Sequence, residues 1–230
     1  MSPFHVLLLR HGETDSNATA VIQGWLPVPL NATGHRQARR LAERLRTFEP
    51  RVRRLESSDL VRAVQTAEPI AAALGLGVTT HTMWRERGLG QLEGKPVAEH
   101  VAWRALSGEA TPPGAESVGR FQQRAYRAMR ALPQLGPDAS PVAVVTHGGT
   151  IRSVLRLLFD GRLKLAPDQS LGAAGLVMVA NCSIMHLIAE PDPDPTAAPH
   201  DEHDGLVWRI ACVNDVAHLA DAKVTARDSG

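Results

Sequence analysis

The chain has 230 residues, 43% of them hydrophobic, which fits one globular domain with a sizeable core. Its 25 Lys and Arg residues nearly balance its 24 Asp and Glu residues, so it lacks the basic excess typical of nucleic-acid-binding or membrane-surface proteins. Its two cysteines are too few for a disulfide framework or a thiolate zinc site. The apolar run near the N-terminus is too short for a signal peptide or a spanning helix. We therefore expect a soluble, cytoplasmic protein with neither a nucleic-acid nor a membrane partner.

Hydrophobic periodicity predicts the elements of secondary structure. Continuous apolar runs predict buried strands at Val6 to Leu9 and at Val142 to Val145. Helical spacing of apolar residues predicts helices over 34–48, 60–74, 117–132 and about 151–158. Thr33 is a candidate cap for the first helix, and Pro69 should kink the second. Weaker strand candidates are, in chain order, 53–56, 78–81, 176–180, 184–188 and 206–213.

The alternation of strands and helices indicates the fold class. It predicts an α/β protein, a three-layer sandwich with a mostly parallel central sheet and helices on both faces. The last strands follow one another without helices, which indicates an antiparallel hairpin near the C-terminus. We expect one domain over 1–220, with an exposed loop at 190–205 and a flexible tail at 221–230.

Two histidines directly follow the two buried strands. His11 follows the first strand and His147 the second, and each is followed by glycine. Ligands of α/β proteins bind at the carboxyl ends of parallel strands, and glycine lets backbone amides approach an anion. Arg10 adjoins the first histidine, and Arg62 lies in the first turn of its helix, off the apolar stripe. If the two strands are neighbours, these four side chains converge on one anion site.

An anion with several oxygens, such as phosphate, suits two arginines and two histidines, because the guanidinium fork makes charge-assisted bonds to such oxygens. Phosphoryl transfer depends on positioning and on neutralising the charge of those oxygens. A neutral imidazole is also a competent nucleophile, and a carboxylic acid could protonate the leaving group. These residues predict phosphoryl-transfer chemistry, but several carboxyl groups remain candidates for the acid.

Four motifs in order along the chain resemble the histidine phosphatase superfamily, also called the phosphoglycerate-mutase-like family. They are Leu9-Arg10-His11-Gly12-Glu13-Thr14 with Asn17 and Gln23-Gly24, Ser57-Ser58-Asp59-Leu60 with Arg62-Ala63 and Gln65-Thr66-Ala67, Arg85-Glu86 with Leu89-Gly90 and Leu92-Glu93-Gly94, and Val145-Thr146-His147-Gly148-Gly149 with Ile151-Arg152. Shorter matching segments are Gly114-Ala115-Glu116-Ser117, Asn181-Cys182-Ser183-Ile184, and Asn214-Asp215 with His218-Leu219. The resemblance covers about residues 5–219. Four ordered motifs make coincidence improbable.

The resemblance implies a role for each matching residue. It implies that His11 is the nucleophile, that Glu86 donates the proton to the leaving group, and that Arg10, Arg62 and His147 bind the phosphoryl group. It further implies phosphate or substrate contacts by Asn17, Gln23, Gly24 and the Gly148 amide. Neither a metal nor an organic cofactor is implied. The expected partner is a small phosphorylated metabolite, and the oligomeric state cannot be read from the sequence.

The chain departs from the family pattern in two respects. Val28 stands before Pro29-Leu30 where the family often has an acidic residue, which concerns one supporting polar contact and not the chemistry. The interval between Glu86 and Glu116 leaves little room for the long insertion typical of the mutases. Hydrolysis needs water at the phosphohistidine and a mutase must exclude it, so the short interval favours a phosphatase. We take 85–118 as the substrate-specificity segment.

Other functions and other roles remain open. A phosphoglycerate mutase primed by a bisphosphorylated cofactor is the second candidate, and a non-catalytic phospho-ligand-binding module is the third. Glu13 is expected to make a local structural hydrogen bond, and Trp25, Trp84 and Trp103 either line the pocket or pack elsewhere. The histidine- and acid-rich 200–204 cluster is interpreted as a solvated loop and not as a metal site.

Overall fold

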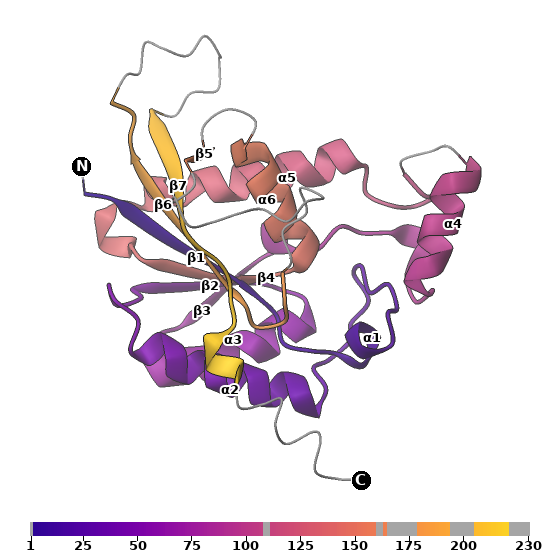
Figure 1. Cartoon of the computed structure of the whole chain (residues 1–230), viewed down its shortest axis with the longest axis horizontal. Coiled ribbons are helices and arrows are strands. Elements are labelled where there is room, and N and C mark those ends of the chain that lie inside the picture. Colours follow the sequence, from indigo (N-terminus) through magenta and orange to yellow (C-terminus); the bar gives the residue numbers. More distant parts are fainter. Residues whose placement is uncertain (1, 108–110, 160–162, 165–178, 194–204, 221–230) are drawn as a thin grey trace.

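The structure is a computed structural model that describes residues 2–107, 111–159, 163–164, 179–193 and 205–220. In these ranges, Figure 1 shows a central sheet between two layers of helices. The strands are β1 (Phe4–Arg10), β2 (Arg54–Ser58), β3 (Val78–His81), β4 (Val142–Thr146), β5 (Leu163–Lys164), β6 (Ile184–Pro191) and β7 (Leu206–Asp215). The helices are α1 (Asp15–Ala18), α2 (Ala32–Arg46), α3 (Val61–Leu74), α4 (Val97–Ser107), α5 (Val118–Ala131) and α6 (Gly148–Phe159). The predicted α/β sandwich is confirmed.

The described strands form one sheet in the order β3-β2-β4-β1-β6-β7-β5. The β3, β2, β4 and β1 strands run parallel, whereas β6 and β7 form the predicted antiparallel pair. Strands β1 and β4 are neighbours, and their register places Arg10 opposite Thr146. His11 and His147 therefore leave the sheet side by side, at the edge beyond which α1 lies in Figure 1.

Two apolar cores lie on opposite faces of the sheet, because successive side chains of a strand point to opposite sides. Val6 and Leu8 of β1 face the core built with α5 and α6. Leu7 and Leu9 face the core built with α2 and α3. A strand buried on both faces has to be apolar throughout, which explains the continuous runs in the sequence.

The ends of the elements differ from the sequence predictions in a few places. Asn31, not Thr33, caps α2, because its side chain accepts a hydrogen bond from the Gly34 amide at 2.8 Å. Helix α4 was not predicted, and it lies within the 85–118 segment. The 176–180 strand candidate falls mostly outside the described residues, as do most of the 190–205 loop and all of the 221–230 tail. The proposed division of the chain stays a prediction.

Gly34 of α2 packs against the backbone that follows His11. A Cβ atom at Gly34 would lie 2.1 Å from the Glu13 carbonyl oxygen, and one at Gly12 would lie 2.7 Å from the Gly34 carbonyl oxygen. Backbone atoms cannot move aside as a flexible side chain can. The two glycines therefore allow the loop after β1 to meet the start of α2, and this contact fixes the backbone beside His11.

We expect Gly34→Ala to destabilise the protein by about 3 kcal/mol, since overpacking against rigid neighbours costs that much. The matched control is Gly119→Ala in α5, where an added Cβ meets nothing within 4 Å. Alanine is the better helix former, so the control should gain about 0.5–1 kcal/mol. Urea unfolding measures both variants. Equal stability of Gly34→Ala and the natural protein would contradict the close contact.

Candidate active site

His11 is buried at the end of β1, with 3% of its surface exposed. Its Nδ1 atom lies 2.7 Å from the Gly12 carbonyl oxygen. A carbonyl only accepts, so Nδ1 carries the proton and Nε2 keeps its free lone pair. Burial, followed by the charges of Arg62 and Arg10, lowers the pKa of His11 well below its usual value. The imidazole is therefore neutral at neutral pH, as a nucleophile must be.

His147 is fully buried at the end of β4, and its ring centroid lies 5.1 Å from that of His11. Its Nε2 atom lies 2.9 Å from the Ser58 hydroxyl oxygen at the end of β2. Its Nδ1 atom is buried without a hydrogen-bond partner. Burial, then the charges around it, with Arg62 first, also lower the pKa of His147 well below 6.5. The expected meeting of the two histidines is confirmed.

The two predicted arginines belong to the same cluster. Arg10 donates from Nη1 to the Val179 carbonyl oxygen, and Arg62 donates from Nη2 to the Gly24 carbonyl oxygen at 2.8 Å. The Nε atoms of Arg10 and Arg62 are both buried without a partner. Both charges act on His11 and on His147, which places all four groups within short electrostatic range.

The residues beside His11 thus carry three unpartnered buried nitrogens, Arg10 Nε, Arg62 Nε and His147 Nδ1. Buried donors without acceptors cost free energy, so their presence indicates a ligand that supplies acceptors. An anion with several oxygens would satisfy them. The geometry supports a phosphate site with the free Nε2 of His11 available for attack.

Glu86 reaches this cluster from the loop that follows a short 3-10 helix, Thr82–Trp84. Its two carboxylate oxygens accept hydrogen bonds from the amides of Gly149 at 2.8 Å and Arg87 at 2.9 Å. A Cβ atom at Gly149 would lie 2.2 Å from Glu86 Oε1. The absence of a side chain at Gly149 therefore leaves room for the Glu86 carboxylate, which binds the Gly149 amide. The arrangement holds a carboxyl group at the start of α6, beside the histidines and arginines of the site.

The backbone of Gly12 also differs from the expectation. Its amide donates to Thr66 Oγ1 at 3.0 Å and is not free for an anion. The Gly148 residue is buried at the start of α6, where an added Cβ would lie 3.5 Å from Arg10 Nε. The predicted phosphate contact of Gly148 stays a prediction, while the anion contact expected of the Gly12 amide was wrong.

Asn17, Gln23 and Gly24 make hydrogen bonds with residues next to the site. Asn17 Oδ1 and Gln23 Oε1 lie 3.1 and 3.0 Å from Thr14 Oγ1, and Gly24 offers its carbonyl oxygen to Arg62. Their roles as substrate contacts stay predictions. Glu13 accepts a hydrogen bond from the Asn31 side chain at 2.9 Å, which agrees with its expected structural role.

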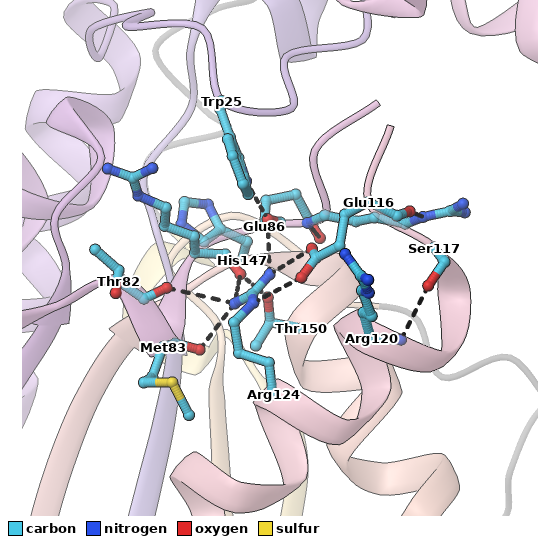
Figure 2. A network of polar contacts seen from close by, with 12 residues as sticks. Trp25, Thr82, Met83, Glu86, Glu116, Ser117, Arg120, Arg124, His147 and Thr150 are labelled. Carbon is cyan, nitrogen blue, oxygen red and sulfur yellow. Dashed lines mark hydrogen bonds and ion pairs between the residues drawn. The ribbon is translucent and has the colours of Figure 1, made fainter. Parts of the chain in front are cut away.

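The three tryptophans lie in different environments. Trp84 is buried in the core and donates to Glu56. Trp25 is 43% exposed, and its Nε1 donates to the Glu86 carbonyl oxygen at 2.7 Å, so it belongs to the site (Figure 2). Trp103 lies half-buried on α4.

Two residues that were not predicted from the sequence also support the site. Asn181 donates from Nδ2 to the His11 carbonyl oxygen at 3.0 Å and to Asn17 Oδ1. Arg124 of α5 contacts the Glu86 carbonyl oxygen at 3.2 Å (Figure 2). Asn181 had one indication of a role in the sequence, its place in a segment that resembles the family. Arg124 had none, because its position in the sequence is that of a residue on the polar face of a helix.

The buried neutral histidines make stability depend on pH. In the unfolded chain they titrate near 6.5, and in the folded protein the pKa of each lies well below that. Between these values the unfolded state binds more protons, so stability is fully present above about pH 6.5 and is lost as pH falls. Each histidine contributes a slope of at most about 1.4 kcal/mol per pH unit.

We expect His147→Gln to lower the slope of unfolding free energy against pH between about 5 and 6.5, by up to that amount. Urea unfolding in phosphate-free buffers measures it, since bound phosphate would mask the effect. His35→Gln, at an exposed position of α2, is the control and should keep the natural slope. Parallel pH profiles for the His147 variant and the natural protein would contradict the buried neutral state.

In the part of the chain that the structure describes, no group of three or more His, Cys, Asp or Glu side chains could hold a metal ion. No described helix combines the length and apolarity needed to cross a membrane. The 200–204 cluster lies outside the described residues. Absence of a metal and of a cofactor stays a prediction.

The fold and the site define an α/β protein in which two arginines and a second histidine cluster around a neutral, strand-end histidine. A family model of the histidine phosphatase superfamily (branch 1) matches residues 6–189. The chain belongs to this superfamily, as its four motifs indicated.

Curated relatives carry mutase names. The chain is 40% identical over 226 residues to "Phosphoglycerate mutase-like protein 4" of Arabidopsis thaliana, and the match covers 94% of this chain and 87% of the relative. It is 33% identical to "Probable phosphoglycerate mutase GpmB" of Yersinia enterocolitica, with 93% of this chain and 94% of the relative covered.

Similar solved structures include both a phosphatase and a mutase. A mycobacterial glucosyl-3-phosphoglycerate phosphatase superposes with a TM-score of 0.71 at 26% identity, covering 93% of this chain and 99% of the other. A phosphoglycerate mutase from Thermus thermophilus superposes with a TM-score of 0.59 at 33% identity, covering 79% and 91%. The chain is therefore an enzyme of the phosphatase and mutase type.

Proposed function

We propose that the protein is a phosphomonoesterase that hydrolyses a small phosphorylated metabolite through a phosphohistidine on His11. The single observation that carries the proposal is the neutral His11 ring, whose Nε2 keeps its lone pair and whose neighbouring residues carry three unpartnered buried nitrogens. The proposed reaction requires no metal ion.

The reaction balances in two steps. His11 Nε2 attacks phosphorus, the N–P bond forms, and the bond from phosphorus to the ester oxygen breaks. Glu86 acts as the general acid and gives a proton to the leaving oxygen. Water then attacks phosphorus, Glu86 takes its proton, and breaking the N–P bond restores the neutral imidazole.

Arg10, Arg62 and His147 hold the transferring group in this proposal. Their charges and donors neutralise the oxygens of the phosphoryl group, which lowers the barrier to transfer. A cavity of about 510 Å³ lies beside the Glu86 loop and is lined in part by Trp25, Glu93 and Glu116. It supports the assignment of the 85–118 segment to recognition of the rest of the substrate.

A phosphoglycerate mutase is the second candidate, favoured by the names of the similar proteins. The two reactions differ in the acceptor of the phosphoryl group, which is water in the phosphatase and a substrate hydroxyl in the mutase. The short interval between Glu86 and Glu116 supports the phosphatase.

The decisive experiment measures both inorganic phosphate and isomerised phosphoglycerate in the presence of EDTA. The protein is incubated with p-nitrophenyl phosphate and a panel of phosphorylated metabolites, and separately with 3-phosphoglycerate and a bisphosphoglycerate primer. We expect release of inorganic phosphate in EDTA and little isomerisation. Isomerisation without net phosphate release would establish the mutase instead, and loss of activity in EDTA would point to a metal.

A further inference from the structure

Arg124 lies on α5 and forms a bidentate ion pair with Glu116. Its Nε and Nη2 atoms lie 2.9 and 2.7 Å from the two carboxylate oxygens. The side chains of Arg124 and Glu116 are only 16% and 13% exposed. The pairing leaves other N–H groups of the guanidinium for further acceptors and balances its charge.

The remaining donors of Arg124 reach the backbone that leads to Glu86. Nη1 donates to the carbonyl oxygens of Met83 and Arg85, both at 2.9 Å, and Nη2 lies 3.2 Å from the Glu86 carbonyl oxygen. Figure 2 shows the guanidinium between the Glu116 carboxylate and this segment. One side chain thus contacts three of the four carbonyls from Met83 to Glu86.

Other side chains complete the same arrangement. The Trp84 carbonyl oxygen accepts from Thr146 Oγ1 at 2.7 Å, and the Arg85 carbonyl oxygen also accepts from Thr150 Oγ1 at 3.0 Å. The Glu86 carbonyl oxygen also accepts from Trp25 Nε1. One 3-10 turn, Thr82–Trp84, begins this segment, and neither a strand nor an α-helix continues it, so side chains hold its conformation.

We propose that Arg124, held by Glu116, is a positioning residue that aims the Glu86 carboxyl group at the leaving-group oxygen. The inference rests on the proposed function, because it assigns Glu86 the proton transfer. Arg124 contacts the backbone of Glu86 and not its carboxylate, so it acts through Glu86. A proton donor displaced by about 1 Å loses much of its effect, and the loss is greatest for esters whose leaving oxygen needs the proton most.

The test compares phenyl phosphate with p-nitrophenyl phosphate, which have similar shapes but leaving groups of different basicity. In Arg124→Met we expect kcat/KM for phenyl phosphate to fall by at least about tenfold more than for p-nitrophenyl phosphate. Arg127→Met changes an exposed arginine of the same helix and should leave both values unchanged. Equal losses for the two substrates would indicate a general structural role and overturn the proposal.

A double-mutant cycle with Glu86→Gln measures whether the leaving-group effects of the two substitutions are additive. A purely structural role of Arg124 would not make them non-additive. If Arg124 acts through Glu86, Arg124→Met adds little to the leaving-group effect already present in Glu86→Gln. Additive effects would overturn the proposal. Arg124→Lys should restore little, because one ammonium cannot replace the planar fork across Glu116 and three carbonyls.

The cycle also separates this proposal from the proposed function. Absence of a leaving-group effect in Glu86→Gln would remove the proton-donor role of Glu86, and with it the positioning role of Arg124. A clear effect in Glu86→Gln with none in Arg124→Met would overturn the positioning role alone. If Arg124→Met does not fold, Glu116→Gln weakens the same ion pair and is measured in its place, with the same outcomes.

Discussion

In His11→Ala, hydrolysis of p-nitrophenyl phosphate in EDTA should fall by about 10⁴-fold or more. The substitution removes a neutral ring nitrogen that keeps its lone pair and whose neighbouring residues carry the unpartnered donors. His147 does not offer a second such nitrogen, because its Nε2 accepts from the Ser58 hydroxyl and its unpartnered Nδ1 then carries the proton. Acid-quench trapping with labelled substrate should find the phosphoryl group on the natural protein and none on the variant.

His35→Ala is the matched control, since His35 lies exposed on α2. It should keep full activity and the same trapped label. Unfolding midpoints show that His11→Ala is folded under the assay conditions. Labelled phosphoenzyme in His11→Ala, or activity within tenfold of the natural protein, would assign the nucleophile to another residue.

The sequence predicted the parts of the site that depend on local pattern. Apolar runs buried on both faces placed His11 and His147 at strand ends, and helix periodicity placed Arg62 in a first turn. The convergence of these residues required β1 and β4 to be neighbours, which no local pattern shows. The motif order supported that pairing only through the resemblance, and the register of Arg10 with Thr146 confirms it.

The supporting residues could not be predicted because their roles arise from contacts between segments far apart in the chain. Gly34 resembles an ordinary residue near a helix start until Glu13 is packed against it. Arg124 lies on the polar side of an amphipathic helix, where most arginines face water. Its proposed function comes from carbonyls about 40 residues earlier, which are left as acceptors because neither a strand nor an α-helix uses them.

Arg62→Met should lower kcat/KM by about 10³-fold, close to the effect of removing a preorganised donor from a buried site. Arg62 is 1% exposed, and its two terminal nitrogens donate to the carbonyl oxygens of Gly24 and Leu26. These bonds fix the plane of the guanidinium while its Nε stays unpartnered. Burial lowers the pKa of Arg62 to about 10, so it remains charged at neutral pH.

Phosphate binding separates this anion role from a purely structural one. Inorganic phosphate should raise the unfolding temperature of the natural protein, and the increase should be largely lost in Arg62→Met. Arg39→Met, at an exposed position of α2, is the control and should keep it. An undiminished phosphate effect in Arg62→Met would show that Arg62 only supports the 24–26 loop.

Arg62→Lys is the sharper comparison, because it keeps the positive charge. A lysine ammonium can occupy one of the positions of the guanidinium, but it cannot hold both carbonyls and also present a donor to the anion. Its desolvation is also less well compensated, which lowers the pKa of the ammonium and weakens its charge at the site. We therefore expect Arg62→Lys to recover no more than about tenfold of the lost kcat/KM. Full recovery would mean that charge alone suffices and that the planar geometry held by Gly24 and Leu26 has no part in catalysis.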